Sequence, residues 1–338
     1  MQGRAQTLAV MCATRGLRMI ELLPWGILIG TYFLLPSYLP LATQIIVMIL
    51  FALSLDLLLG YTGIVTLGHA AYYGVGAYTA GILAVSGWSE PISGLLAATA
   101  MAAIVGLVTG YIILRTKGLT LLMLGMAVTL LLEALANHFN SITGGADGLQ
   151  GITMPPLLGR FEFDLYGKVG YVYAAVVLFL AWLVCRRLLL APFGRSLVGI
   201  RENPVRMAAI GVPVARRKLV IFTVAAGLAG LAGALSAQTN QFVSLNSLSF
   251  ELSGTVLVVL VLGGAGRLYG AFIGAPIYLI AQDALAKSSP TFWLFWLGLI
   301  LIGIVMFSRG GVLGIVDLLR RQLAGLFGRG AAKIGEVL

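Results

Sequence analysis

Cysteine, histidine and charged residues are all scarce in this chain of 338 amino acids. It has only two cysteines and two histidines, which excludes a disulfide framework and leaves no cluster with the spacing of a metal site. Charged residues make up 10% of the chain, whereas 59% of its residues are hydrophobic. One soluble core does not hide so much apolar surface, so the sequence indicates a protein whose solvent is a lipid bilayer.

Long apolar segments predict the fold class. A helix that crosses a bilayer needs about 20 mostly apolar residues, because it must satisfy its own backbone hydrogen bonds. Ten segments are candidates, several of them short: 22–36, 41–59, 64–85, 91–114, 118–136, 169–185, 219–238, 252–263, 271–286 and 291–307. We therefore expect an all-α polytopic membrane protein with about eight to ten transmembrane helices. The 44 glycines interrupt many segments, which favours close helix packing or broken helices.

The basic residues orient the predicted helices. With the N-terminus in the cytoplasm, 19 of the 22 basic residues fall on the cytoplasmic side, as the positive-inside rule requires. The net charge of +10 then needs no nucleic-acid partner. The predicted organisation is a cytoplasmic tail (1–21), a membrane domain (22–307) and a second cytoplasmic tail (308–338). The membrane domain includes a basic cytoplasmic loop (186–218) and a long outer loop (137–168).

Two familiar sequence signals are missing. The glycine-rich stretch Leu262–Gly274 lacks the lysine of a phosphate-binding loop, so we expect no ATPase activity in this chain. The apolar run near the N-terminus is too short and too interrupted for a secretory signal, and Met19 is an alternative start.

Two similar short stretches hint at an internal repeat: LGYTG at Leu59–Gly63 and LGGAG at Leu262–Gly266.

The basic loop predicts a short amphipathic helix along the cytoplasmic face. Apolar positions recur near helical spacing at Leu197, Ile200, Pro204, Met207, Ala208 and Ile210. Asn203 and Pro204 have the pattern of a cap followed by a first-turn proline, and Gly211 would end the helix. Such a helix either attracts anionic lipid or docks a cytoplasmic partner. Composition does not choose between the two.

The glycine-rich stretch Gly60–Gly81 holds polar side chains that are costly when they face lipid. His69, Tyr72 and Tyr73 are therefore expected to face the bundle interior or a water-filled vestibule. The alternative for each residue is structural: glycine permits tight packing, and the hydroxyls bond neighbouring carbonyls. A neutral, hydrogen-bonded His69 is favoured over a proton relay.

Three acidic residues lie inside predicted membrane segments: Asp56, Glu133 and Asp283. Each would cost several kcal/mol if it faced lipid. We expect each to snorkel to the membrane edge or to make an interhelical hydrogen bond. Coupling to a proton gradient is the alternative.

Four motifs in order resemble the permease subunits of branched-chain amino-acid ABC importers, specifically the LivM-type member of the LivH/LivM family. They are LGHAAYYGVGAYTA (Leu67–Ala80), SITGGADGLQGI (Ser141–Ile152), GRSLVGIRENPVRMAAIGVPVARRKLVIFTVAAGLAGLAGAL (Gly194–Leu235) and LVLGGAGRLYGAFIGA (Leu260–Ala275). The resemblance covers about residues 40–310. It implies ABC importer permease architecture in a bacterial inner membrane.

The resemblance also implies roles for residues. The basic loop would carry the coupling helix that sits on an ATPase subunit, and its residues would be Arg201, Glu202, Arg206, Ala208, Ala209 and Gly211. Their spacing departs from the general Glu-Ala-Ala…Gly pattern, because Ala208 follows Glu202 at a distance and Gly211 comes two residues after Ala209. A broken helix along the translocation path would hold His69, Tyr72, Tyr73 and Tyr78.

The implied function is ATP-driven import of branched-chain or related amino acids by alternating access. The partners would be a second permease subunit, two ATP-binding cassette subunits that bind ATP and Mg, and a periplasmic binding protein. The same family includes permeases for urea, amides and aromatic acids. The residues leave a proton-coupled secondary transporter open as a second class. A membrane enzyme is the least favoured class, because the acids are scattered singly along the chain and do not form a cluster.

Overall fold

The computed structural model describes residues 23–88, 90–153, 167–307 and 311–312. The chain divides into two compact units, residues 1–257 and residues 258–338, and the boundary falls inside one helix. Every regular element of the described residues is helical, apart from one isolated antiparallel bridge between Leu149 and Val243. The predicted tails lie outside the description except for residues 311 and 312.

Ten helices correspond to the ten predicted apolar segments. They are α2 (Leu23–Leu34), α3 (Leu39–Thr62), α4 (Ala70–Val85), α5 (Pro91–Ile113), α6 (Leu119–His138), α8 (Lys168–Leu190), α11 (Val214–Asn240), α12 (Phe250–Gly263), α13 (Gly270–Ser288) and α14 (Trp293–Phe307). Shorter elements connect them: η2 (Pro36–Tyr38), α7 (Asn140–Thr143), η3 (Gly145–Asp147), α9 (Pro192–Glu202), α10 (Pro204–Ala209) and η4 (Leu245–Leu248). Five of the described spans are long and apolar enough to cross a membrane: 36–62, α5, α6, α8 and α11. The predicted all-α polytopic fold is confirmed.

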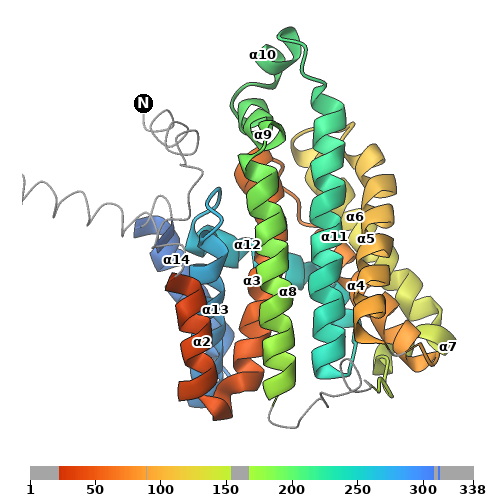
Figure 1. The fold of residues 1–338 in the computed structure, drawn as a ribbon, viewed down its shortest axis with the longest axis vertical. Coiled ribbons are helices and arrows are strands. Elements are labelled where there is room, and N and C mark those ends of the chain that lie inside the picture. Colours follow the sequence, from red (N-terminus) through yellow and green to blue (C-terminus); the bar gives the residue numbers. More distant parts are fainter. Residues whose placement is uncertain (1–22, 89, 154–166, 308–310, 313–338) are drawn as a thin grey trace, which may run out of the picture. The chain divides into compact units, whose positions relative to one another are not determined.

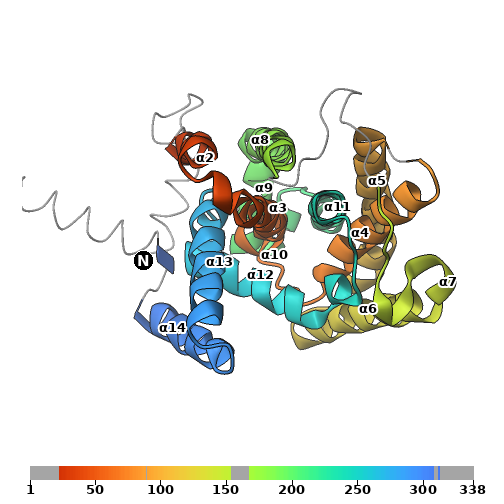
Figure 2. The same cartoon turned by 90° about the horizontal axis from the view of Figure 1, so that it is seen from below.

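Helix α3 forms the core of the first unit. It begins with a proline in its first turn, where the missing N–H removes no helical hydrogen bond, and it ends at Gly63, whose φ of 72° is left-handed. Leu50, Leu57 and Leu58 are all fully buried. Helices α8 and α11 pack against α3, and α11 also packs against α4 and α5 (Figure 2). A span covered by other helices in this way is a central element of a polytopic bundle.

Glycines set the close approach of α4, α5 and α11. A Cβ added at Gly76 of α4 would overlap the backbone of Gly230 on α11, and a Cβ added at Gly233 would overlap the carbonyl of Tyr73. These contacts bring backbones together without any side chain between them, which is how small residues stabilise helix pairs in lipid. The glycine-rich composition is thus explained by packing at these positions.

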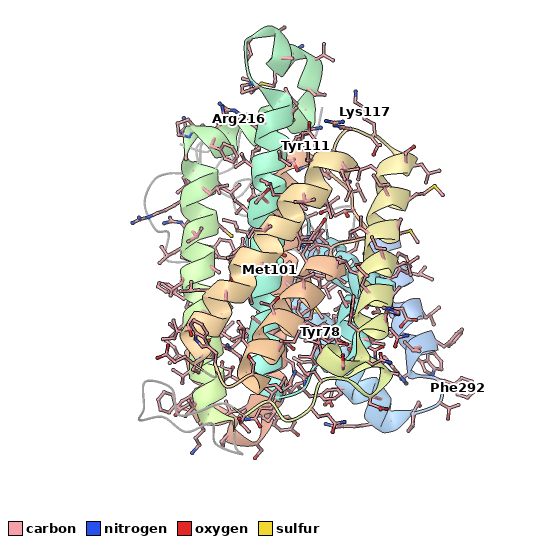
Figure 3. The ribbon with its side chains drawn as sticks, turned by 90° about the vertical axis from the view of Figure 1, so that its right-hand side faces the viewer. Tyr78, Met101, Tyr111, Lys117, Arg216 and Phe292 are labelled. Atoms are coloured by element: carbon pink, nitrogen blue, oxygen red, sulfur yellow. The ribbon has the colours of Figure 1, made fainter. Side chains whose placement is uncertain are left out.

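The outward faces of the first unit are apolar. Leu96 and Ile104 of α5 are 63% and 58% exposed, and Leu130 and Leu131 of α6 are 55% and 58% exposed. Met101 of α5 points outward in the same way (Figure 3). A surface of large apolar side chains around a bundle is expected when the surrounding solvent is hydrocarbon.

The chain between α3 and α4 is not helical. The segment 64–85 was predicted as one span, but its helix begins only at Ala70, so the predicted start is wrong. The left-handed Gly63 stops α3, and a Cβ at Gly68 would overlap the carbonyl of Gly125 on α6. Gly68, within the non-helical stretch, therefore lies directly against the backbone of α6.

The second unit packs the end of α12 against α13. A Cβ added at Gly274 would overlap the carbonyl of Val259, and a Cβ at Gly263 would overlap that of Gly270. The second glycine cluster found in the sequence therefore permits a close helix pair within this unit. The internal repeat stays a prediction.

Candidate functional site

The basic loop folds into two short helices. Leu197 and Ile200 of α9 are buried, at 0% and 2% exposed. The Asn203 side chain accepts a hydrogen bond from the backbone N–H of Arg206 at 2.9 Å and so caps α10, as predicted from the Asn-Pro pair. The predicted short helix between this cap and Gly211 corresponds to α10, and the extended backbone of Asn203 separates it from α9, which carries Leu197 and Ile200.

Helix α10 has no buried residue and projects beyond the ends of α8 and α11, at the opposite end of the first unit from α7 (Figure 1). Two large apolar side chains on or beside it, Val205 and Ile210, are 77% and 68% exposed. Gly211 follows with a φ of 85°, a conformation that favours glycine. The predicted coupling residues Glu202, Arg206, Ala208 and Ala209 are all exposed.

Sequence reasoning missed Val205. It is not among the predicted apolar positions of the loop, which are Leu197, Ile200, Pro204, Met207, Ala208 and Ile210. The available signal was the Asn-Pro cap itself, since a new helix that starts at Pro204 places Val205 on its first exposed turn.

Two arginines connect α9 to the membrane helices. The guanidinium of Arg201 donates a hydrogen bond to the carbonyl of Gly60, near the end of α3. That of Arg217 on α11 donates to the hydroxyl of Ser196 and lies over the ring of Phe193, 5.8 Å from its centroid. Arg201, one of the predicted coupling residues, is thus engaged within the chain. The coupling role of these residues stays a prediction.

His69 is fully buried at the start of α4. Its ring is nearly parallel to that of Phe51, with the centroids 5.5 Å apart. The Ser54 hydroxyl donates to the Phe51 carbonyl at 2.6 Å, so the Ser54 oxygen accepts from Nε2–H of His69 at 2.8 Å. The hydroxyl of Ser253 accepts from the N–H of Ala70 at 2.9 Å. These bonds hold the first turn of α4 against α3 and α12.

The three predicted path tyrosines are buried in the first unit. The hydroxyl of Tyr72 is 2.8 Å from Oγ1 of Thr109, and the ring of Tyr73 lies 4.7 Å from that of Phe51, measured between centroids. His69, Tyr72 and Tyr73 therefore surround one interior region, as expected of polar side chains in hydrocarbon. Tyr78 lies further along α4, and its buried hydroxyl has no hydrogen-bond partner among the described residues. That these residues line the translocation path stays a prediction.

The three intramembrane acids have different surroundings. Asp56 is 1% exposed inside α3, whereas Asp283 makes an ion pair with Lys287 of the same helix at 2.6 Å. Glu133 is half-buried on α6. The described residues contain no group of three or more His, Cys, Asp or Glu side chains arranged to hold a metal ion.

Residues 37–307 match the family described as branched-chain amino acid transport system / permease component. The chain belongs to this family. It is a permease component of a transport system and a multi-pass membrane protein.

Individual relatives agree with the family. The high-affinity branched-chain amino acid transport system permease protein LivM of Escherichia coli is 30% identical over 300 residues, which cover 81% of this chain and 69% of that protein. LivM of Salmonella typhimurium is 28% identical over 80% of this chain and 68% of its own. The autoinducer 2 import system permease protein LsrC of Klebsiella pneumoniae is 30% identical over 49% of this chain and 47% of its own. No solved structure matches the chain.

Proposed function

We propose that this chain is one of two permease subunits of an ATP-driven importer that moves branched-chain amino acids into the cytoplasm. The observation that carries the proposal is α10, whose exposed Val205 and Ile210 project from a bundle of apolar spans. Large apolar side chains on a short helix outside the bundle favour a docked protein partner over free solvent. The LivM relatives support the choice of cargo.

The proposed complex contains a second permease, two ATP-binding cassette subunits and a periplasmic binding protein. ATP and Mg bind to the cassette subunits, and α10 faces the cytoplasm. This orientation is supported by basic residues at the end of the first unit that carries α10, where Arg216 and Lys117 lie (Figure 3).

The proposed mechanism is alternating access. Closure of the cassette subunits on ATP moves α10, and α9 carries the movement to the end of α3 through the hydrogen bond from Arg201 to Gly60. The hydrogen bond between His69 and Ser54, which holds the first turn of α4 against α3, then carries the movement to α4. Coupling requires that nucleotide and cargo each bind the two conformations with different affinity.

Purification of the tagged chain from its native membrane tests the proposal. Mass spectrometry of the co-purifying proteins should find two cassette ATPases, a second permease and a binding protein. Proteoliposomes whose cassette subunits face the lumen should accumulate leucine only when the lumen also contains ATP. Leucine uptake by the isolated chain without ATP would instead identify a secondary transporter.

The cargo needs its own measurement, because one relative is named for autoinducer 2 import. Uptake should be measured for leucine, isoleucine and valine beside urea, an amide and an aromatic acid. Uptake of the three branched-chain amino acids alone supports the proposed cargo, whereas preference for another compound assigns the chain to a different branch of the family.

A further inference from the structure

Glu133 lies on the inward stripe of α6. Gly125 and Thr129, eight and four residues earlier, are both buried, and a helix places residues at this spacing on one face. A Cβ added at Gly68, just before α4, would overlap the carbonyl of Gly125, so this stripe faces α4. Leu130 and Leu131 occupy the lipid side of α6 instead. Glu133 therefore points toward the bundle.

Tyr78 is the opposing group on α4. Helices α4 and α6 are in contact near Gly68 and Gly125. Further along, α4 also packs against α7, the element that follows α6, so the two helices run in the same direction from that contact. Tyr78 and Glu133 then lie at similar heights, and the tyrosine lies within electrostatic range of the carboxylate. Figure 3 shows Tyr78 in the half of the first unit away from Lys117.

Both groups lack a protein partner among the described residues. The Tyr78 side chain is 6% exposed, and its buried hydroxyl makes no hydrogen bond there. The structure gives Glu133 neither an ion pair nor a hydrogen bond within the same residues. A buried hydroxyl and a carboxylate in a membrane helix are both unfavourable unless something binds them. A ligand that offers a cationic hydrogen-bond donor to Glu133 and a hydrogen-bond acceptor to Tyr78 would satisfy both side chains.

We propose that Glu133 and Tyr78 form a binding site for the zwitterionic end of an amino acid. The carboxylate of Glu133 accepts hydrogen bonds from the ammonium group of the cargo, and the hydroxyl of Tyr78 donates to its carboxylate. The site rests on the proposed function and assigns the recognition of the charged end to this permease. A cargo without an ammonium group gains nothing from Glu133.

Leucine uptake by the complete importer in proteoliposomes tests this site. Glu133→Gln keeps the size of the side chain and removes its charge, and it should lower kcat/KM for leucine by roughly 10- to 100-fold, the range of a charge-assisted hydrogen bond. Glu133→Asp retains the charge and should keep more activity than Glu133→Gln. Tyr78→Phe should lower kcat/KM by roughly 3- to 10-fold.

Matched controls use exposed residues of the same types. Glu90→Gln and Tyr111→Phe change an exposed carboxylate and an exposed hydroxyl, and both should retain the wild-type kcat/KM. The recovery of the second permease and the thermal midpoint of the complex should be the same for Glu133→Gln and wild type. Unchanged recovery and an unchanged thermal midpoint would show that Glu133 is not needed for assembly, so that a loss of uptake reports on ligand binding.

Different outcomes overturn different statements. If wild type imports leucine and Glu133→Gln matches it within about twofold, the site is wrong while the proposed function stands. If Glu133→Gln loses the second permease, Glu133 pairs with that subunit, and the site is again wrong. If a protonophore abolishes wild-type uptake despite ATP, Glu133 is better explained by proton transfer. If wild type imports no amino acid, the proposed function fails together with the site.

Discussion

The guanidinium of Arg201 on α9 donates a hydrogen bond to the backbone carbonyl of Gly60, within the last turn of α3. The last four carbonyls of a helix have no partner inside that helix, so this contact satisfies one of them from another element. The Cγ of Arg201 also lies 3.2 Å from the position a Cβ would take on Gly63. The element that leads to α10 is therefore fastened to the place where the chain leaves α3.

Replacement of Arg201 by alanine should uncouple ATP hydrolysis from transport. The change removes a charged hydrogen bond, which contributes about 1.5–3 kcal/mol, at the junction that the proposed mechanism uses. We expect at least tenfold fewer leucine molecules imported per ATP in proteoliposomes, a change of about 1.4 kcal/mol or more. Arg195→Ala removes an exposed arginine from the same helix and serves as the control. Equal transport per ATP in both variants would show that the junction does not transmit the movement.

The sequence predicts the helices better than the breaks between them. Hydropathy located ten of the described helices, because an apolar helix of this kind depends mainly on length and apolar composition. The Asn203 cap was also predictable, since it depends on four consecutive residues. The start of α4 was not, because it depends on the close approach of Gly68 to the Gly125 carbonyl of α6, which hydropathy does not show.

The candidate site was also predictable only in part. The types of its residues were visible in the sequence, because His69 and the tyrosines are unusual in an apolar segment. Their partners were not visible, since Ser54, Thr109 and Ser253 lie on other helices. The pairing of Tyr78 with Glu133 likewise depends on which face of α6 meets α4, which only the tertiary structure gives.

Substitution of Gly76 by alanine should destabilise the protein. The added Cβ would overlap the backbone of Gly230, and overpacking at such a contact costs about 1–3 kcal/mol. Gly26→Ala is the control, because no described atom lies within 4 Å of its added Cβ. The thermal midpoint in detergent, followed by size-exclusion chromatography, should fall for Gly76→Ala and stay unchanged or rise for Gly26→Ala. Equal midpoints would mean that α4 and α11 separate without cost.

Removal of the Ser54 hydroxyl should weaken the junction of α3 and α4. Ser54→Ala leaves the buried Nε2–H of His69 without its 2.8 Å partner, which costs about 1–3 kcal/mol. Ser86→Ala removes an exposed hydroxyl that bonds only its own helix and should cost less. Thermal midpoints compare the two, and the Ser54→Ala, His69→Phe double variant provides a further check. If His69→Phe does not reduce the loss caused by Ser54→Ala, the two residues are not coupled.

Charge placed on α10 should release the cassette ATPases without unfolding the membrane helices. Val205 is 77% exposed, and a carboxylate there would have to be desolvated in any docked complex, so Val205→Asp opposes binding but not folding. Ala208→Trp tests the same surface by size, since Ala208 is exposed on the same helix. The amount of ATPase that co-purifies should fall at least tenfold in both variants, while the thermal midpoint of the permease stays constant.

Ile142→Asp introduces the same charge at an exposed apolar position in α7, at the opposite end of the first unit, and should leave ATPase recovery unchanged. Full ATPase recovery with Val205→Asp and Ala208→Trp would mean that α10 is not the docking element, and its exposed apolar side chains would then be better explained by insertion into the membrane interface.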